Sequence, residues 1–381
     1  MTASRESVDG PRDSGTLRRV PPSPPPPLAL LAELTHRCPL RCVYCSNPLD
    51  LVPREAELTP RDWAKVIREA ADLGVLQMHF SGGEPLLFEG LTPLLGQAHD
   101  AGLYTNLITS GWGLTPGRVA ELARAGLDHV QVSFQDTDRE TARAVAGVEA
   151  LDAKLAAARA VRGADIALSV NLVMHRDNLA RMGEMIDLAA TLGAARVEVA
   201  STQYHGWALE NRSQLLASAE ALEEAGEVAR ERRLRYAGSL DVLYVLPDYV
   251  TGWPKPCMDG WGRRSLTVAP DGRVLPCPGA TCISTLTFDD VRLRSLGDIW
   301  RSGAAFEAFR GVSWMPEPCA SCERRALDFG GCRCQAFALT GDARRTDPTC
   351  AKSPDHGIVL RARALAERRT ASLPVYREMR R

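Results

Sequence analysis

The chain has no apolar run of eighteen or more residues, the length that a membrane-spanning helix needs. Its N-terminus, MTASRESVDGPRDSG, contains acidic residues and no apolar core, so it lacks the pattern of a secretory signal peptide. Net charge is also nearly absent, because 46 basic and 47 acidic side chains sum to -1. These absences argue against bulk attraction to nucleic acid or anionic membrane, and we expect a cytoplasmic protein that acts on a small molecule or a protein.

With 381 residues and 45% hydrophobic content, the chain can bury one large core and a smaller one. Residues 1–27 are polar and then proline-rich, which predicts a disordered tail. From Leu28 onwards, short apolar runs alternate with amphipathic stretches. The runs predict strands at 28–34, 75–81, 103–110, 129–134, 166–174 and 195–200, and the stretches predict helices at 61–73, 91–101, from about 116, 152–161 and 179–192.

Six such units predict an α/β fold, a partial (β/α)6 TIM-like barrel with its chemistry at the carboxyl ends of the strands. We expect this barrel to span residues 28–245, with a long helix over about 213–232 near its end. Glycine, proline and cysteine accumulate in residues 246–350, which predicts a second, metal-dependent domain. We expect residues 351–381 to form a basic helical tail at the C-terminus.

The cysteines are the main candidates for functional residues. Eleven cysteines in short spacings, in a reducing compartment, indicate metal or iron–sulfur ligands rather than disulfides. Cys38, Cys42 and Cys45 follow the first strand, and three thiolates can hold three irons of a [4Fe–4S] cluster while the fourth iron stays open. A structural zinc site is the alternative, although it needs a fourth ligand and only His36 lies nearby.

The C-x3-C-x2-C triplet with Tyr44 before its last cysteine resembles the cluster motif of radical S-adenosylmethionine (SAM) enzymes. The resemblance implies that SAM chelates the open iron and is cleaved to methionine and a 5′-deoxyadenosyl radical. Gly82, Gly83 and Glu84 resemble the family's GGEP segment, which binds the SAM amino group. Candidates for contacts with the SAM ribose and carboxylate follow later strands: Ser110, Ser133, Gln135, Asn171 and residues 201–203.

The remaining cysteines resemble the SPASM extension of this class, which binds two auxiliary clusters, [2Fe–2S] or [4Fe–4S]. The resemblance assigns three cysteines to each cluster: Cys257, Cys277 and Cys332 to the first, and Cys319, Cys322 and Cys350 to the second. Asp328 stands where the SPASM pattern has a cysteine, so we expect it to be an oxygen ligand of the second cluster. Cys334 is the expected fourth ligand of the first cluster, with Cys282 as the alternative. Zinc knuckles are the alternative for the whole domain.

Local stretches narrow the resemblance to the peptide cyclases of pyrroloquinoline quinone biosynthesis: 31–51, 79–88, 102–111, 126–136, 255–264, 314–319 and 328–336. This family implies a carbon–carbon bond between a glutamate γ-carbon and a tyrosine ring of the precursor peptide PqqA. It also implies the chaperone PqqD and a flavodoxin- or ferredoxin-type electron donor. Residues 1–27 are too few for a fused peptide-recognition domain, so we expect a separate protein to recognise the leader.

Two other functions remain open at this stage. Another SPASM peptide maturase could form a thioether or a formylglycine, and the cluster motifs alone do not separate these activities. A multi-cluster electron carrier is a different class, but it would have no use for an open iron or for a GGEP strand end. Formation of 5′-deoxyadenosine from SAM would distinguish an enzyme from a carrier.

Overall fold

The computed structural model of the protein describes residues 24–367 and 373–378, so residues 1–23 of the predicted disordered tail lie outside the described residues. The described strands form one curved sheet in the order β7-β6-β5-β4-β3-β2-β1-β8-β9. They are β1 (Ala29–Thr35), β2 (Gln77–Gly82), β3 (Tyr104–Thr109), β4 (His129–Phe134), β5 (Ala167–Met174), β6 (Arg196–Ser201), β7 (Asp241–Val245), β8 (Ser265–Val268) and β9 (Val274–Leu275). All neighbours are parallel except β8 and β9.

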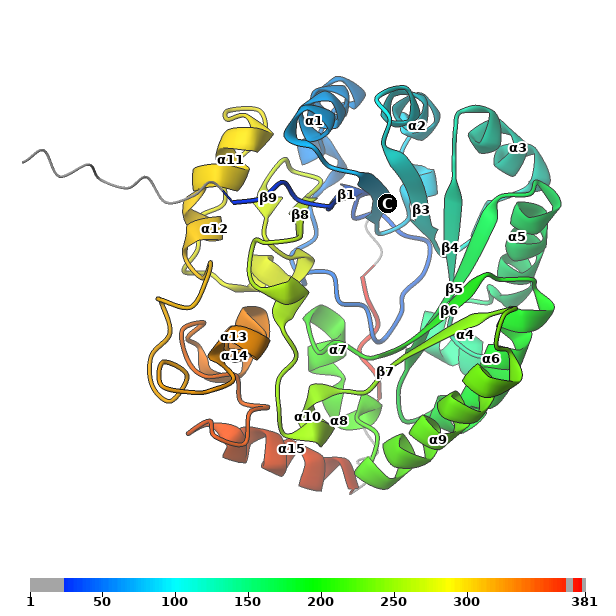
Figure 1. Ribbon diagram of the computed structural model, residues 1–381. Helices are drawn as coiled ribbons and strands as arrows, with labels where there is room; N and C mark the ends of the chain where they lie inside the picture. The colour runs from blue at the N-terminus through cyan, green and yellow to red at the C-terminus, as the bar shows by residue number, and fades with distance from the viewer. Residues whose placement is uncertain (1–23, 368–372, 379–381) are drawn as a thin grey trace, which may run out of the picture.

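The helices between the strands lie along the outer face of the curved sheet (Figure 1). They are α1 (Pro60–Leu73), α2 (Leu91–Asp100), α3 (Pro116–Arg124), α5 (Leu151–Gly163), α6 (Met182–Thr191) and α9 (Ala219–Arg235). Helix α4 (Arg139–Ala146) instead contacts the loop that follows β1. The six predicted β/α units are therefore confirmed, as a partial barrel whose strand ends share one rim. Short 3-10 helices lie at Arg54–Ala56, Pro85–Leu87, Leu179–Arg181, Cys257–Asp259 and Pro278–Cys282.

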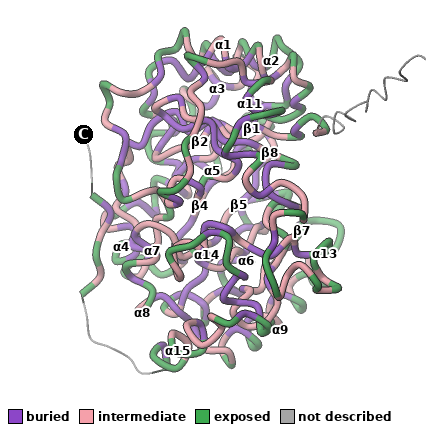
Figure 2. Tube along the Cα trace, turned by 90° about the vertical axis from the view of Figure 1, so that its left-hand side faces the viewer, coloured by how far each residue is buried: buried purple, intermediate pink, exposed green. Residues whose placement is uncertain are grey.

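Helix α1 illustrates how local sequence produces these units. Thr59 and Asp62 form a reciprocal capping box at its start, with Pro60 at the first helical position, and Gly74 ends it with φ +90°. Its inward residues, including Trp63 and Val66, are buried in the same core as the strand residues beneath the helix. Buried residues gather along the strands and on the helix faces toward them (Figure 2), which makes the barrel rim a rigid support.

The structure corrects one predicted helix and adds elements that were not predicted. The long helix predicted over 213–232 is instead a short α8 (Arg212–Leu215), a break, and then α9 from Ala219, because Ser218 caps α9 through its side chain. A seventh parallel strand, β7, and helix α4 were not predicted. Another short helix, α7 (Gly206–Glu210), follows β6.

The cysteine-rich region is joined to the barrel through the sheet. Strand β8 pairs with β1, and β9 pairs with β8, so residues from the C-terminal region extend the barrel sheet. Its helices are α10 (Asp248–Thr251), α11 (Leu296–Ser302), α12 (Ala304–Glu307), α13 (Arg325–Asp328), α14 (Arg333–Thr340) and α15 (His356–Glu367). The domain boundary after residue 245 stays a prediction. In the described residues, no helix is both long and apolar enough to cross a membrane.

Candidate active site

The three-cysteine loop begins where β1 ends. Main-chain hydrogen bonds hold it against the end of α4, from Arg41 N to Ala146 O at 2.7 Å and from Val43 N to Val145 O at 3.1 Å. Burial raises the pKa of the Cys38 thiol to about 11 and that of Cys42 to about 12. Buried thiols of this kind become thiolates when a cationic partner compensates the charge, and the irons of a cluster supply that compensation.

The three thiols are close enough to influence one another electrostatically, since the charge of Cys38 and of Cys45 raises the pKa of Cys42. In the part of the chain that the structure describes, no three cysteine, histidine or acidic side chains converge as ligands of one metal ion would. A cluster has a looser requirement, because each cysteine binds a different iron. This donor set fits a three-cysteine cluster.

A cavity of about 420 Å³ opens beside the loop, at the carboxyl ends of the strands. Seven of the eight predicted SAM-binding residues line it together with the three cysteines: Tyr44, Gly82, Gly83, Ser110, Ser133, Gln135 and Asn171. Ser201 and Gln203, from the end of β6, line it too. The barrel topology thus brings together side chains that are up to about 160 positions apart in the chain. Their individual contacts with SAM stay predictions.

The packing of the protein backbone requires glycine at both glycine positions of the GGEP segment. A Cβ on Gly82, which has φ +127°, would lie 2.3 Å from Thr35 O, and one on Gly83 would lie 2.3 Å from Arg37 O. Gly83 N also donates to Thr35 O at 2.6 Å, and Glu84 N donates to Arg37 O at 2.8 Å. The glycines therefore let the end of β2 pack directly on the start of the cysteine loop.

Glu84 is the predicted residue that does not line the cavity. Its fully buried carboxylate accepts hydrogen bonds from Thr109 Oγ1 at 2.7 Å, Ser110 N at 2.9 Å, Ser110 Oγ at 2.5 Å and Leu86 N at 3.2 Å. Burial raises the pKa of this carboxyl, and the hydrogen bonds from Ser110 and Thr109 oppose that shift. Direct contact of Glu84 with the SAM amino group stays a prediction, whereas its observed partners join β2 to β3.

A buried cation that was not predicted from the sequence lies beside this site. Lys154 Nζ donates to Ser110 O and Ser133 O, each at 2.9 Å, and so ties the ends of β3 and β4 together. Burial lowers the pKa of Lys154 to about 8. A signal was present, because Lys154 shares the buried stripe of α5 with Leu151 and Ala158, where a lysine is unexpected.

Tyr44 is held from two sides. Gln135 Nε2 donates to Tyr44 Oη at 2.9 Å, and the His175 ring lies 5.9 Å from the Tyr44 ring, between centroids. Burial raises the pKa of Tyr44 well above its usual value, so its hydroxyl keeps its proton. The predicted residues Tyr44 and Gln135 therefore support each other as well as the cavity wall.

The cysteines of the first auxiliary set, which the SPASM resemblance implies, lie close together in the structure. The thiols of Cys257 and Cys334 donate to Cys277 and to Cys332, and these hydrogen bonds lower the pKa of both acceptors. Cys334 contacts both acceptors, whereas Cys282 contacts Cys334, donating its thiol to the carbonyl of Cys334 at 3.6 Å. This placement favours Cys334 over Cys282 as the fourth ligand, and the assignment stays a prediction.

His205 is a further neighbour of the first auxiliary set that the sequence did not reveal. It hydrogen-bonds Cys332, and although burial alone would lower the pKa of His205, this bond and the nearby cysteines raise it to about 9. His205 immediately precedes α7 of the barrel. Its chain position gave no indication of this contact, because the residue lies far from every cysteine in the sequence.

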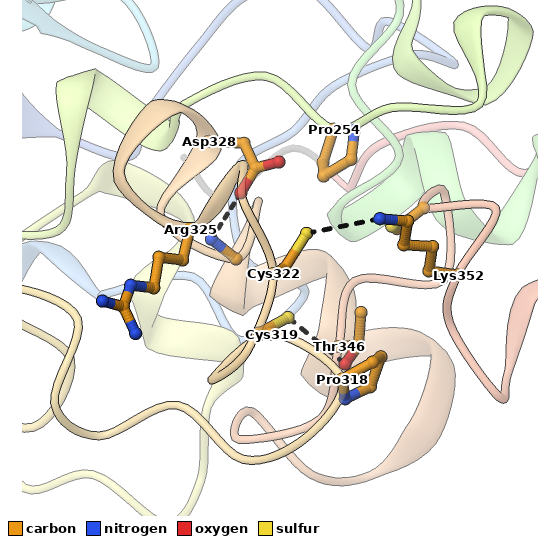
Figure 3. A pocket seen from close by; sticks show the side chains of 10 residues that line it. Pro254, Pro318, Cys319, Cys322, Arg325, Asp328, Thr346 and Lys352 are labelled. Carbon is orange, nitrogen blue, oxygen red and sulfur yellow. Dashed lines mark hydrogen bonds between the residues drawn. The ribbon is translucent and has the colours of Figure 1, made fainter.

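The second auxiliary set surrounds one small pocket (Figure 3). Cys319, Cys322, Asp328 and Cys350 line it together, and Asp328 is only 7% exposed. Lys352 Nζ donates to Cys322 Sγ at 3.8 Å, and Cys319 Sγ lies 3.4 Å from Thr346 Oγ1. The placement of Asp328 is that of a candidate ligand, and ligation by it stays a prediction.

Comparison with known proteins agrees with this arrangement. The profile of the radical SAM superfamily matches residues 32–189, and that of the iron–sulfur cluster-binding SPASM domain matches residues 257–323. The PqqA peptide cyclase of Streptomyces rochei is 53% identical over 92% of this chain and 96% of its own length. The PqqA peptide cyclase of Gluconobacter oxydans strain 621H is 52% identical over 89% of this chain and 94% of its own.

The chain belongs to the PqqA peptide cyclase family of radical SAM proteins. Solved structures with low sequence identity to this chain share its fold. SuiB of Streptococcus suis, bound to S-adenosylmethionine, matches with a TM-score of 0.70 at 18% identity, over 85% of this chain and 77% of its own. AnSMEcpe with bound AdoMet and a peptide matches with a TM-score of 0.64 at 15% identity, over 90% of this chain and 99% of its own. The family is thus one of iron–sulfur enzymes that use SAM.

Proposed function

We propose that this protein catalyses the first step of pyrroloquinoline quinone biosynthesis, joining a glutamate γ-carbon to the tyrosine ring within PqqA. The observation that carries this proposal is the identity of about half of all residues to PqqA peptide cyclases over nearly the whole chain. The cavity supports it, because the three-cysteine loop and the polar strand ends meet at one site.

The chain's own residues would hold and shield the reacting groups. Cys38, Cys42 and Cys45 would ligate the cluster that, with SAM, supplies a 5′-deoxyadenosyl radical. Polar groups around the cavity, such as Ser133 and Asn171, would orient SAM, and the buried walls would keep water from the radical. Formation of the new bond removes two hydrogens from the peptide, one as an atom taken by the radical and one as a proton plus an electron.

The auxiliary sets would receive that electron. We propose that Cys257, Cys277, Cys332 and Cys334 hold one auxiliary cluster and that Cys319, Cys322, Asp328 and Cys350 hold the other, each [2Fe–2S] or [4Fe–4S]. His205 contacts the first set, while Ala208, three residues later, donates from its backbone to Cys45 O at 3.2 Å. A single short segment thus connects an auxiliary set with the radical site.

We further propose PqqD as the partner that presents PqqA, and a flavodoxin- or ferredoxin-type protein as the electron donor. We propose that the protein works in the cytoplasm, because a reducing compartment keeps cysteines available as iron–sulfur ligands.

The test is an anaerobic reaction of reduced enzyme with SAM, PqqA and PqqD. We expect a peptide product lighter by two hydrogens, with the new bond mapped between the glutamate γ-carbon and the tyrosine ring by tandem mass spectrometry. PqqA in which the reacting glutamate is replaced should give 5′-deoxyadenosine without that product. A thioether or formylglycine product, or the absence of 5′-deoxyadenosine, would contradict the proposal. Omitting PqqD should slow the reaction strongly, and full activity without it would remove PqqD from the scheme.

A further inference from the structure

The C-terminal segment 373–378 returns to the mouth of the barrel. Asn211, buried at the end of α7, pairs with Val375 in both directions, donating to Val375 O at 2.7 Å and accepting from Val375 N at 2.8 Å. Asn211 Nδ2 also donates to Val43 O, inside the three-cysteine loop, at 2.8 Å. One amide side chain thus ties the C-terminal segment to the loop that carries the cluster ligands.

Two more contacts hold the same segment. Tyr376 Oη donates to Ala144 O of α4 at 2.8 Å, and the Arg41 guanidinium lies 5.5 Å from the centre of the Tyr376 ring. Arg41 belongs to the three-cysteine loop and also donates to Arg377 O at 3.3 Å. The segment is therefore bound to both sides of the loop, to α4 and to α7.

These contacts place the Arg377 side chain inside the site. Arg377 is 1% exposed and lines the cavity together with the three cysteines. Its guanidinium donates to His36 O, hydrogen-bonds the Cys45 thiol and lies 5.8 Å from the centre of the Trp207 ring. Its Nε is buried without a hydrogen-bond partner. A buried cation with neutral partners is costly unless a negative charge lies close by.

The three-cysteine loop supplies that negative charge when a cluster is bound, because three thiolates outweigh the charge of the iron–sulfur core. Arg377 lines the same cavity as Cys38, Cys42 and Cys45, and its guanidinium contacts the start of their loop at His36 O. The cation therefore acts on the loop at short range and in a medium with little water to screen it.

We propose that segment 373–378 is a working part of the radical site and that Arg377 is a positioning residue, whose buried charge balances the three-cysteine cluster and favours its reduced state. This inference rests on the proposed cluster at Cys38, Cys42 and Cys45, and goes beyond it by assigning a task to the chain's C-terminal segment. One-electron reduction makes the cluster more negative, so a fixed cation nearby stabilises the reduced form more than the oxidised form.

The test is a redox titration of the intact enzyme, followed by electron paramagnetic resonance of the signal that changes when SAM is added. At the potential that half-reduces the wild-type cluster, Arg377→Met should lower the ratio of reduced to oxidised cluster by roughly tenfold or more, given a unit charge within a few ångströms at an effective dielectric near 20. Arg377→Lys should recover most of that ratio. Arg361→Met, which removes an exposed arginine from the same C-terminal region, is the matched control and should titrate like wild type.

Two further variants separate the charge from the attachment. Ending the chain after Ser372 should lower the reduced fraction as Arg377→Met does, and Asn211→Ala should lower it by less, since it loosens the segment but keeps the cation. If Arg377→Met titrates like wild type, or if Arg377→Lys behaves like Arg377→Met, the proposal is overturned. Wild-type enzyme that lacks the SAM-responsive signal would instead contradict the cluster assignment itself.

Discussion

Glu84 was predicted from a motif to contact SAM, but its carboxylate contacts other residues of the protein. The GGEP resemblance predicts a carboxylate that accepts from the SAM amino group. In the structure both carboxylate oxygens accept from Thr109, Ser110 and Leu86. Because a buried carboxylate with several donors is a strong brace between strands, Glu84 contributes to the site before any ligand binds.

Glu84→Gln should therefore destabilise the enzyme in the absence of SAM. The amide would place an N–H group where Thr109 and Ser110 also donate, and leaving such groups unpaired costs about 1–3 kcal/mol. Chemical denaturation under anaerobic conditions measures the loss, and Glu55→Gln, at an exposed position, is the control. If stability is unchanged while SAM affinity falls, Glu84 acts through the ligand alone.

His175 provides a prediction about pH. Burial lowers the pKa of this ring to about 4, below its usual value of 6.5. The unfolded chain therefore binds a proton between pH 6.5 and pH 4 that the folded chain does not, so the free energy of unfolding falls as the pH is lowered through this window. The contribution is complete above pH 6.5.

His175→Asn, which keeps an acceptor for the Asp177 N–H, should remove that dependence. Between pH 7 and pH 5 the wild type should lose about 2 kcal/mol more stability than the variant. Urea unfolding at several pH values measures the slopes, with His99→Gln, at an exposed position, as the control. Equal slopes in His175→Asn and wild type would show that the buried ring takes up its proton in the folded state.

At the scale of elements, the turn between α13 and α14 separates the two auxiliary sets. Phe329, Gly330 and Gly331 have φ values of +51°, +76° and +80° in succession. A Cβ on Gly331 would lie 2.6 Å from Asp347 Oδ2 and from Pro254 Cβ. This left-handed turn lets Asp328 face one set and Cys332, four residues later, face the other.

Substitution of Asp328 tests its proposed ligation. Asp328→Cys should keep the second auxiliary cluster and lower its midpoint potential, because a thiolate donates more charge than a carboxylate. Asp328→Ala should make one iron labile to chelators. Electron paramagnetic resonance and iron release measure both effects, and Glu367→Ala, which removes an exposed carboxylate of the C-terminal region, is the control. Wild-type spectra and potentials in both Asp328 variants would assign the fourth position to another ligand.

At the scale of the whole molecule, the three-cysteine loop and the two auxiliary sets, whose ligands interleave along the chain, lie within one connected structure. The barrel and the cysteine-rich region share the sheet through β1 and β8, and residues 205–208 touch both an auxiliary cysteine and the radical loop. The ligands of each set remain distinct, so loss of one set leaves the others with their own partners.

Replacement of Cys38, Cys42 and Cys45 together by alanine should accordingly abolish SAM cleavage while the auxiliary iron signals persist. Iron analysis should then give the content of the two auxiliary sites, and chromatographic assay should detect no 5′-deoxyadenosine above background. Release of 5′-deoxyadenosine by this variant would show that the catalytic cluster lies elsewhere. Loss of all iron would show instead that the three sets fold as one unit.

The sequence by itself determined the barrel and its six β/α units, because periodicity is a local property of the chain, and the three cysteine sets stay predictions from ligand spacing and family resemblance. Only the tertiary structure decided the rest. Four residues contact partners that lie far from them in the chain: Glu84, Lys154, His205 and Arg377. These contacts depend on how the strand ends, helix α5 and the C-terminal segment pack together, so they cannot be predicted from positions in the sequence. The physical reason is burial. A sequence does not distinguish a lysine or arginine on the surface from one beside a cluster loop, because only packing removes the water around the buried side chain.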